Sequence, residues 1–98
     1  MLTIVKTNIF SLWLESLKDR KAKIKILRRI ERAEDGNLGD HKNVAGPIWE
    51  IRIDYGPGYR LYYAQTETAV YLLLCGGDKT TQKSDIKTAE TLWRQIRG

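Results

Sequence analysis

The residues best suited to chemistry are the charged side chains of a predicted β-hairpin in the second half of the chain. Apolar and polar residues alternate on either side of the turn Gly56-Pro57-Gly58, so the hairpin has one apolar and one charged face. Arginine binds anions through a planar fork of N–H donors that keeps its charge. The charged face therefore predicts a site for an anion, and its members are Glu50, Arg52, Asp54, Arg60 and Tyr62.

The register expected for this hairpin offers a second interpretation of the same charges. If Tyr55 faces Tyr59 across the turn, Asp54 lies opposite Arg60 on the neighbouring strand. An exposed cross-strand ion pair of this kind contributes at most about 1 kcal/mol. Arg60 is thus expected either to bind an anion or to pair with Asp54.

The charge balance of the 98 residues also indicates an anionic partner. Lys and Arg number 17 against 12 Asp and Glu, which gives a formal net charge of +5 at pH 7. A positive field attracts nucleic acids and acidic proteins alike. One predicted helix is especially basic and forms either a docking surface for a polyanion or a solvated face; its basic residues are Lys18, Arg20, Lys21, Lys23, Lys25, Arg28, Arg29 and Arg32.

Several other classes of site are excluded by the residues present. Cys75 is the only cysteine, so the chain forms no internal disulfide and lacks the ligands of a structural zinc site or an iron–sulfur cluster. Its place at the end of an apolar run favours a core position over a nucleophile. The segment Gly76-Gly77-Asp78-Lys79 lacks the spacing of a P-loop, which excludes an NTPase of that type. We expect neither a metal nor a cofactor.

Hydrophobic periodicity predicts two helices in the first third of the chain. After a β-prone run over residues 2–5, Thr7 or Asn8 can cap a helix whose apolar stripe is Phe10, Trp13, Leu14 and Leu17. A second helix is expected over residues 19–35, with Gly36 as its stop and with Ala22, Ile26, Ile30 and Ala33 facing inward. The short junction between them favours an antiparallel helical hairpin over one bent helix.

The rest of the chain predicts a sheet and a final helix. The apolar run over residues 70–75 is typical of an interior strand, which Gly76 and Gly77 end. Residues 78–85 are expected to cross the end of the sheet, and residues 39–43 to form a polar loop. The final helix has the apolar stripe Ile86, Ala89, Trp93 and Ile96.

These elements predict a single α+β domain over residues 1–98. Its expected parts are an N-terminal helical pair, a small twisted sheet of three or four mostly antiparallel strands, and a C-terminal helix. The helices cover one face of the sheet and leave the charged face open. The chain has neither a signal-peptide pattern nor an apolar run long enough for a membrane span, so we expect a cytoplasmic protein with no membrane partner.

The hairpin and the segments after it carry a specific combination of motifs. They are Trp-Glu-Ile-Arg-Ile-Asp-Tyr-Gly-Pro-Gly-Tyr-Arg-Leu-Tyr-Tyr over residues 49–63, Leu-Leu-Cys-Gly-Gly-Asp-Lys over residues 73–79 with Gln82, and Asp85-Ile86. In this combination the chain closely resembles the addiction module killer proteins, which are toxins of the RelE/ParE/HigB superfamily. The resemblance covers essentially the whole chain.

The resemblance implies a RelE-like fold and a toxin of a type II toxin–antitoxin module. A cognate antitoxin, expected to be a helix-turn-helix protein, would neutralise it. Most relatives of this type act as ribosome-dependent endoribonucleases that cleave mRNA without a metal, so the ribosome and mRNA are the expected partners. ParE-type relatives instead inhibit DNA gyrase without being enzymes, which is the alternative function. A third possibility is a module that only binds its antitoxin.

The resemblance also assigns catalytic residues by their positions. Arg60 matches the family's arginine after the turn, Arg52 matches one of two basic residues on the strand before it, and Lys79 lies near a basic residue after the last core strand. These three would stabilise the charge that develops on the cleaved phosphate. Glu50 stands where the other basic residue occurs, and Ile86 or a neighbour from residue 83 onward stands where the family has a tyrosine.

The residue that transfers the proton is therefore open. Glu50 could accept a proton or balance the arginines at the surface. His41 could titrate near neutral pH or be solvated, and Tyr62 could stack on a base or pack in the sheet. The residues expected to contact RNA are Tyr62, His41, Lys42, Gln82 and Lys83; those expected to dock on ribosomal RNA are Lys21, Lys25, Arg28 and Arg29.

Overall fold

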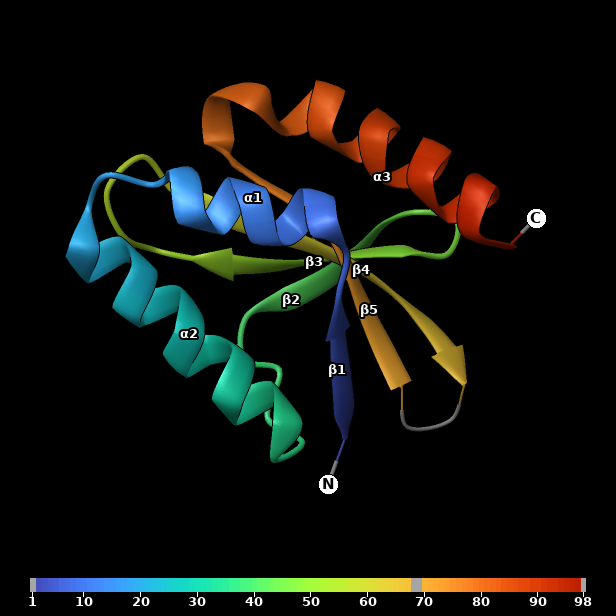
Figure 1. Ribbon diagram of the computed structural model, residues 1–98, viewed down its shortest axis with the longest axis horizontal. Coiled ribbons are helices and arrows are strands. Elements are labelled where there is room, and N and C mark those ends of the chain that lie inside the picture. The colour runs from blue at the N-terminus through green and yellow to red at the C-terminus, as the bar shows by residue number, and fades with distance from the viewer. Residues whose placement is uncertain (1, 68–69, 98) are drawn as a thin grey trace.

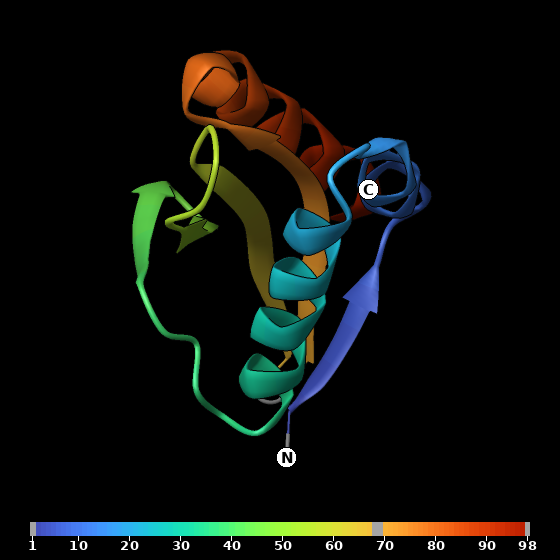
Figure 2. The same cartoon turned by 90° about the vertical axis from the view of Figure 1, so that its left-hand side faces the viewer.

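Five strands form one mixed sheet with helices on both of its faces (Figures 1 and 2). The structure is a computed structural model that describes residues 2–67 and 70–97. It confirms the α+β class with two N-terminal helices and a C-terminal helix. In chain order the elements are β1 (Thr3–Lys6), α1 (Asn8–Ser16), α2 (Arg20–Glu34), β2 (His41–Ala45), β3 (Ile48–Ile53), β4 (Tyr59–Glu67), β5 (Val70–Asp78), the 3₁₀ turn η1 (Lys79–Thr81) and α3 (Gln82–Arg97).

The sheet has the strand order β1-β5-β4-β3-β2. The pairs from β2 to β5 are antiparallel, and β1 pairs parallel with β5, so the sheet is mostly antiparallel as predicted. The expected number of strands was too low because residues 41–45 form the edge strand β2 rather than a loop. The sequence His-Lys-Asn at its start is exposed, and charged or polar residues are common on edge strands because they hinder pairing with other chains.

The β3–β4 hairpin is confirmed, but its predicted register was wrong. Ile53 rather than Tyr55 lies opposite Tyr59, so residues 54–58 form the connection. The longer turn is closed by Gly58, whose N–H donates to the Tyr55 carbonyl and whose φ of +81° favours glycine. As a result Arg52 lies directly opposite Arg60, and Asp54 belongs to the turn instead of pairing with Arg60.

The two N-terminal helices are separate and capped by their own sequences. The Thr7 hydroxyl accepts from the Phe10 N–H at 3.0 Å at the start of α1, and the Asp19 carboxylate accepts from two N–H groups at the start of α2. Gly36 follows α2 with a φ of +94°, as expected of a helix stop. The predicted inward residues of α2 are all buried: Ala22, Ile26, Ile30 and Ala33.

One half of the core lies between the sheet and the pair α1 and α2. Its fully or nearly buried residues are Phe10, Ala22, Ile26, Ile30, Ile51, Ile53, Tyr59, Leu61, Tyr63 and Leu73. Trp13 packs against this cluster from α1, which agrees with its predicted core position. A Cβ at Gly76 would lie 2.4 Å from two carbons of the Trp13 ring, so the indole occupies the space that a side chain on β5 would need.

The other half of the core lies under α3, on the face that the alternation pattern had left open. Tyr62, Ala64, Leu74 and Cys75 form a cluster there with Ile48, Leu72, Ala89 and Trp93. The prediction of an open charged face was therefore wrong for most of that face. Two apolar residues of α3, Ala89 and Trp93, cover it, and only the end beyond the start of α3 keeps its charged side chains accessible.

The end of β5 also differs from the prediction. Gly76 and Gly77 do not end the strand, which continues to Asp78, and α3 begins at Gln82 instead of after Asp85. A Cβ at Gly77 would overlap the Asp85 carboxylate, so this glycine lets α3 start close to the strand. Within residues 2–67 and 70–97, no helix combines the length and apolar character needed to cross a bilayer.

Burial of Cys75 leads to a prediction about its reactivity. The thiol is 4% exposed, and burial raises its pKa from 9.0 to about 12, with a smaller contribution from Asp85. At pH 8 the reactive thiolate is thus about 1,000-fold rarer than in the unfolded chain. We expect a thiol reagent to modify the folded protein at least that much more slowly than the protein in denaturant. Equal rates in both states would contradict the buried position.

Candidate functional site

A cleft where β3 ends and β4 begins collects the predicted catalytic cations. Its lining combines Arg52, Arg60 and Lys79 with Asp40, Ile53, Asp54 and Gly58, and its volume is about 270 Å³. We call it the arginine cleft. It lies where the charged sheet face extends beyond the start of α3.

Arg60 is held in one orientation at the floor of the arginine cleft. The residue is 9% exposed, and its Nη1 donates to the Gly58 carbonyl at 2.6 Å. A Cβ at Gly58 would lie 2.8 Å from the same Nη1, so the guanidinium fits closely against the glycine. A cation fixed in this way needs little reorganisation when it meets an anion.

Lys79 reaches the arginine cleft from the turn η1 that follows β5. Asp78 caps this turn, since its Oδ1 accepts from the Thr80 N–H at 2.9 Å and from the Thr80 hydroxyl at 2.6 Å. These bonds, chiefly that from the Thr80 hydroxyl, lower the pKa of Asp78, with a smaller contribution from Arg60. The cap therefore fixes the strand end from which Lys79 projects.

Glu50 lies beneath the two arginines and is fully buried. Its Oε2 is 3.1 Å from Arg52 Nε, and its Oε1 is 3.7 Å from Arg60 Nε and accepts from Gln82 Nε2 at 3.0 Å. The expectation of a surface carboxylate was therefore wrong. Alternation correctly placed Glu50 on the face of the arginines, but α3 buries this part of that face.

Tyr62 is also fully buried, in the cluster under α3. Burial is the main cause that raises the pKa of its phenol, and the nearby Glu50 adds to the shift. The hydroxyl has no hydrogen-bond partner among the described residues. In this position the ring packs in the core and is not available to stack on an RNA base. The packing alternative for Tyr62 is thus the correct one.

The remaining residues expected to contact RNA are dispersed. His41 lies on the other face of the sheet, where its ring is 5.8 Å from that of Trp49 and its Nδ1 is 2.8 Å from the Gly39 carbonyl. Lys42 is exposed on β2 opposite Glu50, and Lys83 is exposed on α3 beside a separate depression. Gln82 does not line the arginine cleft, but its side chain donates to Glu50, which pairs with both cleft arginines.

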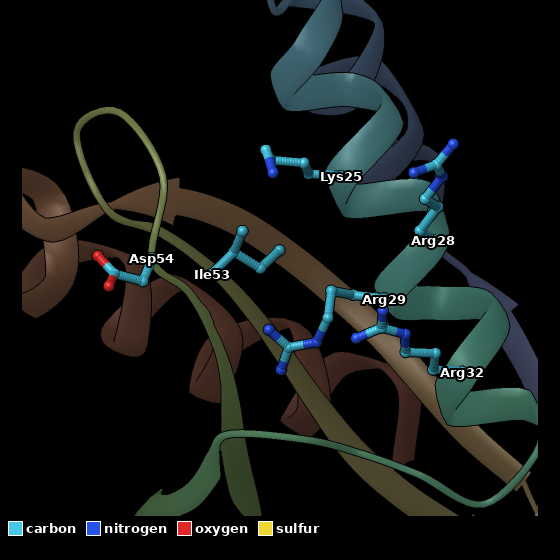
Figure 3. Close-up of a pocket in the computed structure, with 6 residues that line it drawn as sticks. All are labelled: Lys25, Arg28, Arg29, Arg32, Ile53 and Asp54. Carbon is cyan, nitrogen blue, oxygen red and sulfur yellow. The ribbon is translucent and has the colours of Figure 1, made fainter.

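A second basic cleft lies between α2 and the β3–β4 turn (Figure 3). Four basic side chains of α2, Lys25, Arg28, Arg29 and Arg32, line it together with Ile53 and Asp54. We call it the helix cleft. It shares Ile53 and Asp54 with the arginine cleft, so the two clefts are neighbours on one basic surface.

The turn between the two clefts is fixed to the start of α2. The Tyr55 hydroxyl donates to Asp19 Oδ2 at 3.1 Å, while Oδ1 of the same carboxylate caps the helix. Lys25 Nζ lies 5.2 Å from the centre of the Tyr55 ring, in the range of a cation–π contact. Tyr55 therefore holds the hairpin against the helix and sets the distance between the clefts.

Arg29 differs from the other basic residues of α2 because its guanidinium binds backbone. Its Nη1 donates to the Arg52 carbonyl at 2.6 Å and its Nη2 to the carbonyls of Leu38 and Asp40 at 3.1 and 3.4 Å. Burial lowers the pKa of Arg29, and the nearby Asp40 opposes that shift. These contacts give Arg29 a structural role that the prediction of ribosomal RNA docking did not anticipate.

Replacing Arg29 by alanine should therefore destabilise the protein. The change removes the Arg29 donor from the Arg52 and Leu38 carbonyls and one of two donors from the Asp40 carbonyl, and we expect the free energy of unfolding to fall by about 1–3 kcal/mol. Arg28→Ala is the matched control on the same helix, where an exposed side chain should matter by less than about 0.5 kcal/mol. Urea unfolding of both variants measures the difference, and equal midpoints would contradict the structural role.

Sequence reasoning missed Asp40 as a residue of the arginine cleft and misjudged the contact of Gln82. Asp40 lines the cleft because its carbonyl accepts from the Arg52 N–H at 2.8 Å. This hydrogen bond joins the loop before β2 to β3. Gln82 was expected to touch RNA, whereas its side chain supports Glu50. A polar residue at the first position of a helix carries no signal for such a distant partner, so only the fold reveals it.

Comparison with known proteins gives two matches. Residues 12–94 match the model of a family described as phage-derived protein Gp49-like (DUF891). An uncharacterized protein of Haemophilus influenzae is 47% identical over 93 residues, which cover 94% of each chain. The family match spans both helical layers and all the strands of the site, from α1 to α3. The chain therefore belongs to the phage-derived Gp49-like family, a family of the toxin–antitoxin type.

Proposed function

We propose that this protein is the toxin of a type II toxin–antitoxin pair and that it cleaves mRNA on the ribosome, in the cytoplasm. The observation that carries the proposal is the meeting of Arg52, Arg60 and Lys79 in one cleft, from three different strand ends. Family membership supports the toxin assignment. The cognate antitoxin, expected to be a helix-turn-helix protein, is its partner.

In the proposed reaction the 2′-hydroxyl of the preceding nucleotide attacks the phosphorus. The 2′-hydroxyl loses its proton as the new P–O bond forms, and the bond to the 5′-oxygen breaks as that oxygen gains a proton. The phosphorane carries extra negative charge, which preorganised donors stabilise. Arg60 is the main donor because its guanidinium is the most firmly held of the three cations. Arg52 and Lys79 bind the remaining oxygens.

Orientation of the RNA by the ribosome supplies much of the rate enhancement in this proposal. Holding the 2′-hydroxyl in line with the leaving oxygen makes the attack effectively unimolecular, which lowers the demand for an ideal base. The exposed Lys42 and Lys83 would contact the backbone on either side of the cleft. Such phosphate contacts position the strand without reading its sequence.

The helix cleft and the adjacent surface of α2 would dock on ribosomal RNA. Lys21, Lys25 and Arg28 are exposed there, whereas Arg29 is bound to backbone carbonyls. Contacts of this kind release counterions from the phosphates, so ribosome binding should weaken steeply as the salt concentration rises.

Controlled expression followed by mapping of mRNA 5′ ends tests the proposal. New ends at defined positions within translated codons are the expected result. In a translating extract with purified protein, the same ends should appear only on messages that ribosomes occupy. Intact mRNA together with a DNA-damage response would favour gyrase inhibition instead, and expression without any growth defect would favour a module that only binds its antitoxin.

A further inference from the structure

A fully buried carboxylate lies directly behind the arginine cleft. Glu50 on β3 has no exposed surface, and two of its neighbours on the same face, Ile48 and Tyr62, belong to the apolar cluster under α3. Transferring a carboxylate into such surroundings costs several kcal/mol unless cations and donors compensate it. The contacts of Glu50 therefore show what the carboxylate is used for.

Three donors converge on the two oxygens of Glu50. Arg52 Nε is 3.1 Å from Oε2, which makes a charge-assisted hydrogen bond, and Gln82 Nε2 is 3.0 Å from Oε1. Arg60 Nε is 3.7 Å from Oε1, within ion-pair range. This Nε is buried and has no hydrogen bond among the described residues, so Glu50 is the counter-charge that it faces. Both carboxylate oxygens are thus occupied from inside the protein.

The contacts of Glu50 orient the guanidinium groups of Arg52 and Arg60 in the same way. Each guanidinium turns its Nε toward the buried carboxylate, which leaves N–H groups of the terminal nitrogens for other partners; one of these nitrogens, Arg60 Nη1, donates to the Gly58 carbonyl. Because Arg52 and Arg60 are direct cross-strand partners, their like charges would otherwise repel and separate. Glu50 lies between their Nε atoms and offsets this repulsion.

We propose that Glu50 is a positioning residue, which fixes Arg52 and Arg60 through their Nε atoms so that their terminal nitrogens face a phosphate in the arginine cleft. This inference rests on the proposed function for the identity of the phosphate. Gln82 extends the arrangement, since it ties the first turn of α3 to the same carboxylate. The role differs from proton transfer, because a fully buried carboxylate whose oxygens already face three donors is not placed to reach a substrate hydroxyl.

Glu50→Gln is the informative substitution because it keeps the size of the side chain. An amide has one oxygen for three donors and presents an NH₂ group to at least one of them. The guanidiniums should lose their fixed orientation, and we expect kcat for mRNA cleavage to fall about 100-fold. KM should stay constant or decrease, since the change removes a negative charge beside the cleft. Glu15→Gln, the same change at an exposed position of α1 outside both clefts, should leave both constants unchanged.

Arginine Nε–Hε signals in NMR spectra provide a readout that does not depend on cleavage. In the wild-type protein the Arg52 signal should exchange slowly with water, in contrast to that of the exposed Arg28. Glu50→Gln should accelerate the exchange at Arg52. Inorganic phosphate should shift the Arg52 and Arg60 signals of the wild-type protein together, and it should shift them separately or not at all in the variant.

The outcomes distinguish this inference from the proposed function. Fast exchange at Arg52 in the wild-type protein overturns the inference, even where Glu50→Gln does not fold. Loss of the acidic limb of the pH–rate profile with unchanged Arg52 exchange would make Glu50 a general base and also overturn it. If the wild-type protein cleaves no mRNA, the proposed function fails, while the exchange and phosphate measurements still decide the role of Glu50.

Discussion

Replacing Arg60 by alanine should lower the rate of mRNA cleavage by roughly 100- to 1,000-fold, the loss typical of removing one preorganised donor from a developing oxyanion. The guanidinium is nearly buried, and its Nη1 is fixed to the Gly58 carbonyl at 2.6 Å. A water molecule that replaced it would have no comparable orientation or charge. The measurement is primer extension on a defined message in a translating extract, with purified wild-type and variant proteins.

Two further variants separate the charge of Arg60 from its shape. Arg60→Lys keeps the charge but lacks the planar fork, so its rate should lie between those of the wild type and Arg60→Ala. Arg94→Ala removes an exposed arginine from α3 and should cleave at the wild-type rate. Thermal unfolding of each variant shows whether the fold is kept. An Arg60→Ala protein that is folded and cleaves as fast as the wild type would refute the assignment of Arg60.

Replacing Gly76 by alanine should cause a large loss of stability. The new Cβ would lie 2.4 Å from Cε3 and Cζ3 of Trp13, closer than real Cβ contacts allow. Because β5 is an interior strand paired with β1 and β4, neither the strand nor the indole can move without disturbing the core. Overpacking of this kind costs typically about 1–3 kcal/mol. The expected decrease in Tm is about 4–8 °C for each kcal/mol in a domain of this size.

A double-mutant cycle tests the cause of that loss. In a Trp13→Leu background the space beside Gly76 is larger, so the added methyl group should cost less than it does in the wild-type background. Thermal unfolding of the four proteins gives the coupling energy. A Gly76→Ala protein as stable as the wild type, or equal costs in both backgrounds, would show that the indole does not occupy this space.

Much of the fold could be predicted from local patterns. The inward residues of α2, Gly36 as its stop and the apolar run of β5 each depend on neighbours within one element, so periodicity identifies them. The strand β2 was missed because its residues are polar, and its pairing with β3 rather than its own sequence makes it a strand. The register of the hairpin depended on the backbone of Gly58, which a residue type alone does not specify.

The candidate site was also predicted only in part, because local patterns do not show which other elements pack against a residue. Alternation placed Arg52 and Arg60 on one face, and the fold brings Lys79 to the same cleft from a distant strand end. Glu50 was expected near the surface because a charged residue is rarely fully buried, whereas for Tyr62 the sequence left both stacking on RNA and packing in the sheet open. Arg60, which balances Glu50 together with Arg52 of the same strand, is contributed by β4, and α3 covers Tyr62. Sequence periodicity indicates which residues share one face of the sheet. Whether that face is open to solvent depends on how α3 packs against it.

The parallel pairing of β1 with β5 affects how the protein folds during its synthesis. The Thr7 hydroxyl donates to the Leu74 carbonyl at 2.7 Å across 67 positions of the chain, and β5 separates β1 from every other strand. Contacts of such long sequence separation form late and slowly, because a large loop must close first. A growing chain that ends before β5 lacks Lys79, and its β4 lacks one of the two strands that flank it in the sheet. The arginine cleft is therefore assembled only once most of the chain has left the exit tunnel. The order of strands thus delays the assembly of the arginine cleft until synthesis of the chain is nearly complete.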